Sequence, residues 1–186
     1  MRETQRINII CGNRSERMPF LMEQLNQQGI TNYELWDGIY KYDSAKENIN
    51  AAHKQIVEYA KIAEFSEVVI AEDDLLFTHP ESWKRFTSTI PKEYDIYLGG
   101  CYTPVFNPDN TLKSFCGLHL YSVHERFYDT FLSLPKHEHI DRSMEGLGTF
   151  VLADPMVAIQ RNGFSSNTGK DENYEQLLSG RKLFGS

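Results

Sequence analysis

The chain alternates short hydrophobic runs with longer stretches in which hydrophobic residues recur every three or four positions. The short runs at 7–10 and 68–71 are rich in β-branched residues, as is typical of strands, and 33–36 forms a further strand candidate. The longer stretches at 18–25 and 49–63 predict amphipathic helices. The first half is therefore expected to fold as strand, helix, strand, helix, strand.

Polar residues, glycines and prolines mark where these elements begin and end. Gly29 follows the first helix as a C-terminal cap, while Ser44 and Glu47 have the spacing of a capping box at the start of the second helix. Pro135 ends a third helical stretch. In the second half the pattern predicts strands at 94–98, 117–123 and 156–160 and a helix at 125–134.

Strands separated by helices predict right-handed βαβ units. We therefore expect an α/β fold of Rossmann-like type, with a mostly parallel, doubly wound sheet and helices on both faces. The chain carries no repeat and no low-complexity linker, which favours one compact domain over residues 1–186. Ligands bind beyond the carboxyl ends of the strands in such sheets, so polar residues that follow the strand candidates are expected to converge on one edge.

Composition and charge argue against nucleic-acid-binding, membrane-spanning and disulfide-stabilised proteins. The 186 residues include 19 Lys and Arg against 26 Asp and Glu, a formal net charge of −7, which disfavours nucleic acid as a partner. No hydrophobic run reaches the roughly 18–20 residues of a membrane span, and no export signal is evident at the start, so we expect a cytoplasmic protein. Three widely spaced cysteines, Cys11, Cys101 and Cys116, indicate reduced thiols.

Three adjacent acids, Glu72, Asp73 and Asp74, follow the hydrophobic run at 68–71 directly. They repel one another at the end of a buried strand, and a hard cation such as Mg²⁺ or Mn²⁺ stabilises such a cluster. Alternate side chains of an extended segment share a face, so Glu72 and Asp74 are expected to point together and Asp73 the other way. The alternative is a solvated acidic loop after a core strand.

Several short segments, in this order along the chain, resemble family 25 glycosyltransferases, the group of lipooligosaccharide and collagen galactosyltransferase-like enzymes. The resemblance extends from residue 7 to about residue 166. The segments that carry it are Ile7-Asn8-Ile9 with Arg14 and Arg17, 33–38, Ala52-His53, 69–74, 94–99, and His139-Ile140-Asp141 with Pro155 and Gln160.

This resemblance implies a GT-A fold, a nucleotide-sugar donor with UDP favoured, a Mn²⁺ or Mg²⁺ cofactor and a role in lipopolysaccharide biosynthesis. Asp74 is implied as the direct ligand of a cation that bridges the donor's two phosphates. Glu72 is assigned beside it as a second metal residue, and Asp73 is assigned to the donor. A preplaced cation stabilises the negative charge that develops on a departing diphosphate.

Other donor-side residues follow the first two strand candidates. Asn13, Arg14 and Arg17 are positioned to contact the phosphates, although the arginines are equally compatible with an exposed helix start. Asp37 is a candidate for the base or ribose, or simply the first residue of a turn. His53 is a donor-pocket candidate whose alternative is a core histidine with satisfied hydrogen bonds.

The inverting transfer implied by the resemblance needs a base for the acceptor hydroxyl. Asp141 is the first candidate and Glu145 the second, and each is equally compatible with an acid that stabilises a helix start. The chain has no histidine after His139 to complete a metal site. Gln160, His139 or water is expected to take that place.

The remaining expectations concern organisation and alternatives. Residues 1–100 are expected to bind the nucleotide sugar, 101–166 to form the acceptor side, and 167–186 to form a tail or lid. Loops around 104–113 and 165–173 are expected to bind the acceptor, and the latter is either a lid or a frayed end. The alternative functions are a catalytically silent nucleotide-sugar-binding module and a glycosyltransferase that acts on modified bases in DNA.

Overall fold

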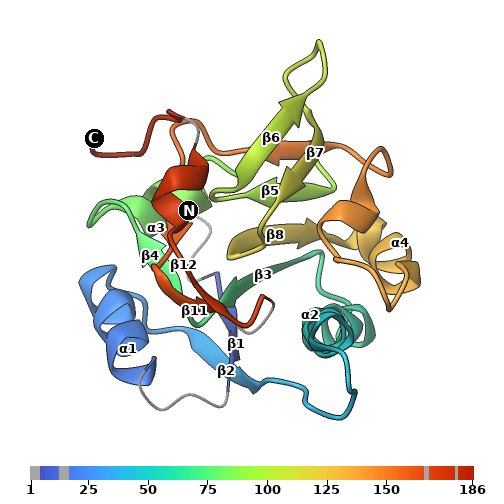
Figure 1. Ribbon diagram of the computed structural model, residues 1–186. Helices are drawn as coiled ribbons and strands as arrows, with labels where there is room; N and C mark the ends of the chain where they lie inside the picture. The colour runs from blue at the N-terminus through green and yellow to red at the C-terminus, as the bar shows by residue number, and fades with distance from the viewer. Residues whose placement is uncertain (1–4, 13–16, 166–167, 179) are drawn as a thin grey trace.

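An eight-stranded mixed sheet forms the centre of the molecule, in the order β2-β1-β3-β8-β5-β9-β7-β6 (Figure 1). The computed structural model describes residues 5–12, 17–165, 168–178 and 180–186. The strands of this sheet are β1 Ile7–Cys11, β2 Tyr33–Asp37, β3 Glu67–Glu72, β5 Ile96–Leu98, β6 Tyr102–Phe106, β7 Leu112–Cys116, β8 Leu120–His124 and β9 Phe150–Leu152.

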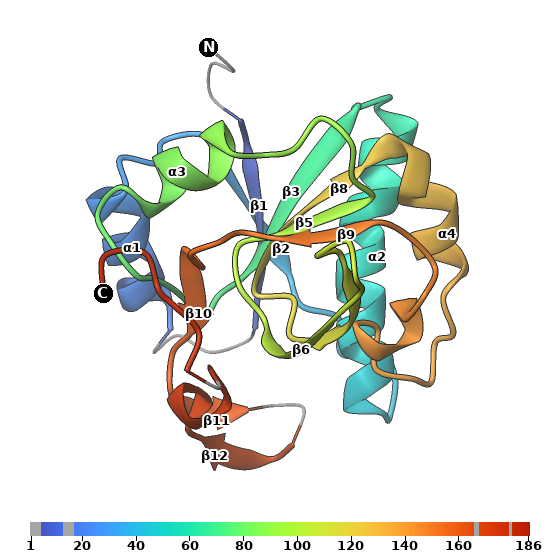
Figure 2. The ribbon, with the colours of Figure 1, turned by 90° about the horizontal axis from the view of Figure 1, so that it is seen from above.

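Helices cover both faces of this sheet, as the sequence pattern predicts. Figure 2 shows α1 and α3 on one side of the sheet and α2 and α4 on the other. No helix in the described ranges is long and apolar enough to cross a membrane. The helices are α1 Met18–Gln27, α2 Ala45–Ile62, α3 Ser82–Ser88 and α4 Tyr128–Ser133, with short 3₁₀ turns η1 Glu125–Phe127 and η2 Arg142–Met144.

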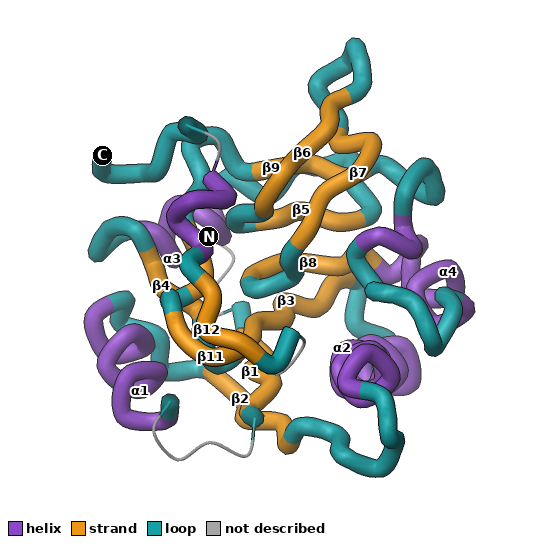
Figure 3. The backbone as a smooth tube through the Cα atoms, viewed as in Figure 1, coloured by secondary structure: helices purple, strands orange, loops and turns teal. Residues whose placement is uncertain are grey.

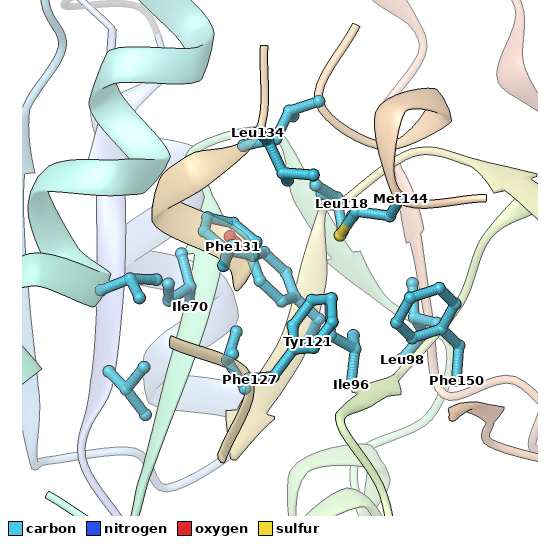
Figure 4. Packing of buried hydrophobic residues seen from close by; sticks show 14 of the residues in the cluster. Ile70, Ile96, Leu98, Leu118, Tyr121, Phe127, Phe131, Leu134, Met144 and Phe150 are labelled. Atoms are coloured by element: carbon cyan, nitrogen blue, oxygen red, sulfur yellow. The ribbon is translucent and has the colours of Figure 1, made fainter. Parts of the chain in front are cut away.

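Alternation along β3 explains its continuous hydrophobic run. Val68 and Ile70 belong to the core under α2 and α4, whereas Val69 and Ala71 belong to the core under α1 and α3. Figure 4 shows the first of these cores, where Ile70 and Tyr121 lie near Phe131 of α4. A strand that is buried on both faces cannot alternate hydrophobic with polar residues.

The α/β fold class is confirmed, but the expectation of a mostly parallel sheet is wrong. β1 runs parallel to β2 and β3, and β5 parallel to β9, whereas β8 is antiparallel to both β3 and β5. The reason is that no crossover helix lies between β5 and β8. The chain forms the antiparallel hairpin β6–β7 there instead, which occupies the segment 104–113 expected to be a loop.

Two small sheets complete the fold. β4 Leu75–Phe77 pairs with β10 Ala158–Gln160, and β11 Gly163–Ser165 pairs with β12 Lys170–Glu172 before the 3₁₀ turn η3 Tyr174–Leu178. In Figure 2, β11 and β12 lie at the end of the molecule beyond β10, and Figure 3 shows them in front of β1. The described part of 165–173 is thus a hairpin rather than a frayed end.

Candidate functional site

The acidic triplet lies in the tight turn between β3 and β4. Glu72 is the last residue of β3, and two residues later Leu75 begins β4. Asp73 and Asp74 are buried, with 5% and 8% of their surface exposed. The turn is therefore not a solvated acidic loop, and the hydrogen-bond partners of its carboxylates decide what it can do.

Asp73 points toward the end of β1. Its Oδ2 accepts the N–H of Gly12 at 2.6 Å, and its Oδ1 accepts Arg17 Nη1 at 2.7 Å. A Cβ atom at Gly12 would lie 3.2 Å from Asp73 Oδ2, so glycine permits this close approach. Arg17 also donates to Asp74 Oδ2 at 3.3 Å and to the carbonyl oxygen of Phe164 at 2.7 Å. Arg17 thereby connects the acidic turn with the C-terminal hairpin.

Glu72 and Asp74 converge on a single amide. Gln160 Nε2 lies 2.9 Å from Glu72 Oε2 and 3.3 Å from Asp74 Oδ1. The backbone N–H of Gln160 donates to the Tyr102 hydroxyl at 2.8 Å, and the pairing of β10 with β4 places Gln160 opposite Leu75. The two carboxylates therefore point together while Asp73 faces away, as side-chain alternation predicts.

His53 supports the acid pair from the core. It is 1% exposed on α2, with Nε2 3.2 Å from Glu72 Oε1 and Nδ1 2.7 Å from the Tyr121 hydroxyl. Since an ionised Glu72 only accepts hydrogen bonds, His53 donates from Nε2 and accepts from Tyr121 when its ring is neutral. His53 is thus a core histidine with satisfied hydrogen bonds that also lines the cleft described below.

The two converging carboxyls, Glu72 and Asp74, have pKa values that are shifted in opposite directions. Burial raises the pKa of Asp74 to about 7, and the charges of Glu72 and Asp73 add to the increase against the opposing charge of Arg17. Burial also acts to raise the pKa of Glu72, but the hydrogen bond and charge of His53 outweigh it and hold that pKa below its usual range. Near neutral pH, Asp74 is therefore the carboxyl that responds to added positive charge.

A cleft of about 760 Å³ opens beside the acidic turn, between α2, the end of β7 and the C-terminal hairpin. This volume lies within the roughly 300–1,000 Å³ of small-molecule sites. The cleft brings together eight residues proposed from the sequence: Arg17, His53, Glu72, Asp73, Asp74, His139, Asp141 and Gln160.

Asp141 and Glu145 differ in their surroundings. Asp141 lines the cleft, where its Oδ2 accepts the N–H of Gly117 and its Oδ1 that of Arg142, both at 2.8 Å. Asp141 therefore both caps η2 and lines the cleft, so its position is compatible with a base as well as with an acid that stabilises a helix start. Glu145 lies outside the cleft lining, with its side chain 53% exposed and 3.9 Å from Lys113. Its candidacy as a base is not supported, because η2 ends before it and its side chain is directed to the surface.

The remaining donor-side candidates are placed less favourably. Asp37 ends β2 at the expected edge of the sheet, but it is exposed and lies outside the cleft lining, which includes its neighbour Gly38. Its carbonyl oxygen accepts Gln55 Nε2 at 3.1 Å, so it takes part in the turn. Asn13 and Arg14 lie outside the described residues.

Sequence reasoning missed several residues of the cleft. Tyr102 stacks on Tyr174 with ring centroids 5.4 Å apart, and Lys46 and Arg142 add positive charge. Tyr102 lies in the hairpin that was expected to be a loop, and Tyr174 in the expected tail. Lys46 lies two residues after Ser44, within the predicted capping box. A cation at a helix start is electrostatically unfavourable without a ligand, so this position was the one sequence signal that could have indicated a cleft residue.

The donor set fits a two-carboxylate cation site. Among the described residues, no group of three or more His, Cys, Asp or Glu side chains is arranged to hold a metal ion. Glu72 and Asp74 nevertheless direct oxygens at one point, which Gln160 Nε2 satisfies. Mg²⁺ and Mn²⁺ sites commonly use one or two carboxylates and complete their shell with water and phosphate oxygens.

Comparisons with known proteins address the fold. No family model and no curated protein matches the sequence. HddC from Yersinia pseudotuberculosis, complexed with GMP-PN, superposes with a TM-score of 0.55 at 14% identity, over 94% of this chain and 98% of that one. The catalytic domain of Drosophila β1,4-galactosyltransferase 7, complexed with xylobiose, gives 0.50 at 10% identity, over 96% and 81%.

A glycosyltransferase involved in glycosylation of the major capsid of PBCV-1 also gives a TM-score of 0.50, at 14% identity, over 80% of this chain and 82% of that one. The chain has a GT-A, nucleotidyltransferase-like fold. The expected GT-A fold is thereby confirmed. At these identities the similarity shows the fold alone, and enzymes with different reactions share the GT-A fold, so function must be argued from the site.

Proposed function

We propose that this protein is a metal-dependent glycosyltransferase of the family 25 type, which transfers a sugar with inversion from a nucleoside-diphosphate donor, favoured to be a UDP-sugar, to a hydroxyl acceptor. One observation carries the proposal. Glu72 and Asp74 converge on Gln160 at the carboxyl edge of parallel strands, inside a cleft that also contains Arg17 and Asp141. In α/β sheets this edge is where ligands bind.

On the donor side, Arg17 supplies fixed positive charge for the diphosphate beside the acidic turn, and Asn13 and Arg14, which precede it in the sequence, are the further donor-side residues of the proposal. Asp73 aligns Arg17 and receives the Gly12 N–H, which orders the end of β1. Through its bond to Glu72, His53 positions that carboxylate. In this proposal Asp37 remains a donor-side candidate at the edge of the sheet, and residues 1–100 form the donor half of the domain.

Mn²⁺ or Mg²⁺ would be held by Asp74 and Glu72, with Gln160 beside them, and its positive charge would stabilise the departing diphosphate. On the acceptor side, Asp141 accepts the proton of the acceptor hydroxyl as the hydroxyl oxygen bonds to the anomeric carbon of the donor sugar. The bond between that carbon and the phosphate oxygen breaks, and its electron pair leaves with the nucleoside diphosphate. The hydrogen bonds from Gly117 and Arg142 hold Asp141 for this transfer.

The test combines binding with turnover. UDP or GDP is expected to raise the melting temperature only with Mn²⁺ present, and UDP-sugars are expected to release UDP with suitable hydroxyl acceptors. Asp141→Asn should retain nucleotide binding and lose most transfer. Cation-dependent binding without transfer or hydrolysis across an acceptor panel would favour the silent binding module. Turnover that requires duplex DNA and falls steeply with salt would favour the DNA-modifying alternative.

A further inference from the structure

Two cations in the cleft have no partner. Lys46 and Arg142 both line it, and over residues 5–12, 17–165, 168–178 and 180–186 neither side chain forms an ion pair or hydrogen bond. The third cation in the cleft, Arg17, is instead bound to Asp73 and Asp74. In a protein with a formal net charge of −7, two unpaired cations that face one cavity mark a place for negative charge.

The surrounding structure holds these cations in place and leaves their charge available. Glu47, the acid next to Lys46, pairs with His137 and is thereby occupied. The loop before Arg142 packs along α2, since Asn50 Nδ2 donates to the Pro135 carbonyl oxygen at 2.8 Å and Lys54 Nζ to that of Leu134 at 2.5 Å. α2 and the 134–142 segment therefore pack together, and we name the part of the cleft lining that Lys46 and Arg142 form the basic wall.

The helix start adds to the positive potential of this wall. Ser44 is the N-cap of the 18-residue helix α2, but its side chain makes no capping hydrogen bond, contrary to the predicted capping box. First-turn N–H groups carry the positive end of the helix dipole, and the cation of Lys46 lies in the same turn. An oxyanion at the wall would relieve this accumulation of like charge.

The position of the wall indicates which substrate it meets. In the proposed function the donor diphosphate lies at Arg17 and the acidic turn, while Asp141 faces the acceptor hydroxyl. Arg142 is the residue after Asp141, and its backbone N–H donates to Asp141 Oδ1 at 2.8 Å. Arg142 is exposed, and as the neighbour of Asp141 it belongs to the acceptor side of the proposed reaction.

We propose, resting on the proposed function, that the acceptor is an anionic sugar whose phosphate or carboxylate group binds Lys46 and Arg142 on the basic wall. Arg142 offers two parallel N–H donors to either oxyanion, and Lys46 adds a point charge. The wall thereby selects acceptors with an acidic group near the hydroxyl that receives the sugar.

The experiment titrates sugars into protein saturated with UDP and Mn²⁺. Glucose 6-phosphate and glucuronate are the two anionic probes, which distinguish phosphate from carboxylate, and glucose is the uncharged reference. At least one anionic sugar is expected to bind about tenfold more tightly than glucose. The double variant K46Q/R142Q is expected to lose that tenfold preference while its affinity for UDP changes less than twofold.

The matched control is K92Q/K182Q, which removes two exposed cations outside the cleft and should leave all affinities unchanged. The single variants K46Q and R142Q, checked by circular dichroism, exclude a folding defect. If K46Q/R142Q weakens UDP binding tenfold, the wall serves the donor diphosphate and the inference is wrong. Equal binding of glucose and both anions, with UDP binding intact, also overturns it. Failure of the wild-type protein to bind UDP or GDP would instead overturn the proposed function.

Discussion

Strand β3 carries a glutamate at each end, and the two glutamates have different surroundings. At its start, Glu67 accepts a hydrogen bond from Gln5 Nε2 at 2.8 Å and another from the Tyr94 hydroxyl at 2.6 Å. The Tyr94 hydroxyl is also 2.9 Å from Ser122 Oγ. These two neutral donors satisfy the carboxylate of Glu67 and thereby stabilise the start of β3.

At the other end of β3, Glu72 begins a run of three carboxylates. Arg17 bonds to Asp73 and Asp74, and His53 and Gln160 bond to Glu72. One guanidinium and one imidazole stand against three carboxylates at this turn, and burial, together with the charges of Glu72 and Asp73, raises the pKa of Asp74. The comparison teaches that the accumulation of carboxylates, rather than one hydrogen-bonded carboxylate, distinguishes the end of β3 at which we propose the site.

The largest expected effect is that of Asp74→Asn. The change should abolish the Mn²⁺-dependent stabilisation by UDP and reduce transfer about 10²–10³-fold. In the proposed function the cation loses its main carboxylate ligand and no longer stabilises the departing diphosphate. Without metal, the variant should be at least as stable as the wild type, since one repelling charge is removed. Melting curves with and without Mn²⁺, and initial rates, measure both effects.

The matched change at the other end is Glu67→Gln. The glutamine side chain would place its own N–H donor against either Gln5 Nε2 or the Tyr94 hydroxyl. The lost hydrogen bond should lower the free energy of unfolding by about 1–2 kcal/mol in urea titrations. Its Mn²⁺ response and transfer rate should remain within about twofold of the wild type. If Glu67→Gln lost the cation response as Asp74→Asn should, the distinction between the two ends of β3 would be lost.

The pH dependence should also separate the two ends. Burial raises the folded-state pKa of Asp74 to about 7, above its unfolded value near 4. Its contribution to stability is therefore complete below pH about 4 and is lost as the pH rises through about 7. In EDTA, the free energy of unfolding should fall over this interval by at most about 1.4 kcal/mol per pH unit. Asp74→Asn should flatten this slope, whereas Glu67→Gln should retain it.

The smallest expected effect is that of Arg17→Lys. Lysine retains the charge but cannot span Asp73, Asp74 and the Phe164 carbonyl oxygen at once. We expect a loss of about 0.5–1 kcal/mol in urea titrations, with faster proteolysis of the β11–β12 hairpin. Arg126→Lys, at an exposed pair with Glu93 and Asp95, is the control and should change neither measurement. Equal effects of the two changes would contradict the connecting role of Arg17.

Local sequence patterns predicted the first half of the fold well. The hydrophobic run at 68–71 and the helical repeat at 49–63 became β3 and α2, because buried strands and amphipathic helices impose distinct spacings. The second half was predicted less well. β5 fell within the predicted strand at 94–98, but β9 contains three residues, too few for a periodic signal, and the β6–β7 hairpin carries Pro104 in a segment that was expected to be a loop.

The candidate site shows the same division. Glu72, Asp73 and Asp74 were evident as consecutive acids, but Gln160 was one of several options for a place beside them. Its selection depends on the pairing of β10 with β4, which joins residues more than 80 positions apart. Lys46 and Arg142 carried no motif, because two distant cations become one wall only when the 134–142 segment packs along α2.

By itself, the order of residues determined the α/β class, the two-faced burial of the central strand and the place where negative charge accumulates. These depend on local periodicity and on neighbours along the chain. The direction of β8, the position of Gln160 beside Glu72 and Asp74, the position of Asp141 in the cleft, and the placement of Lys46 and Arg142 on one cleft lining were decided only by the tertiary structure. Each depends on contacts between segments far apart in sequence, and the packing of the whole core, rather than any short pattern, selects among them.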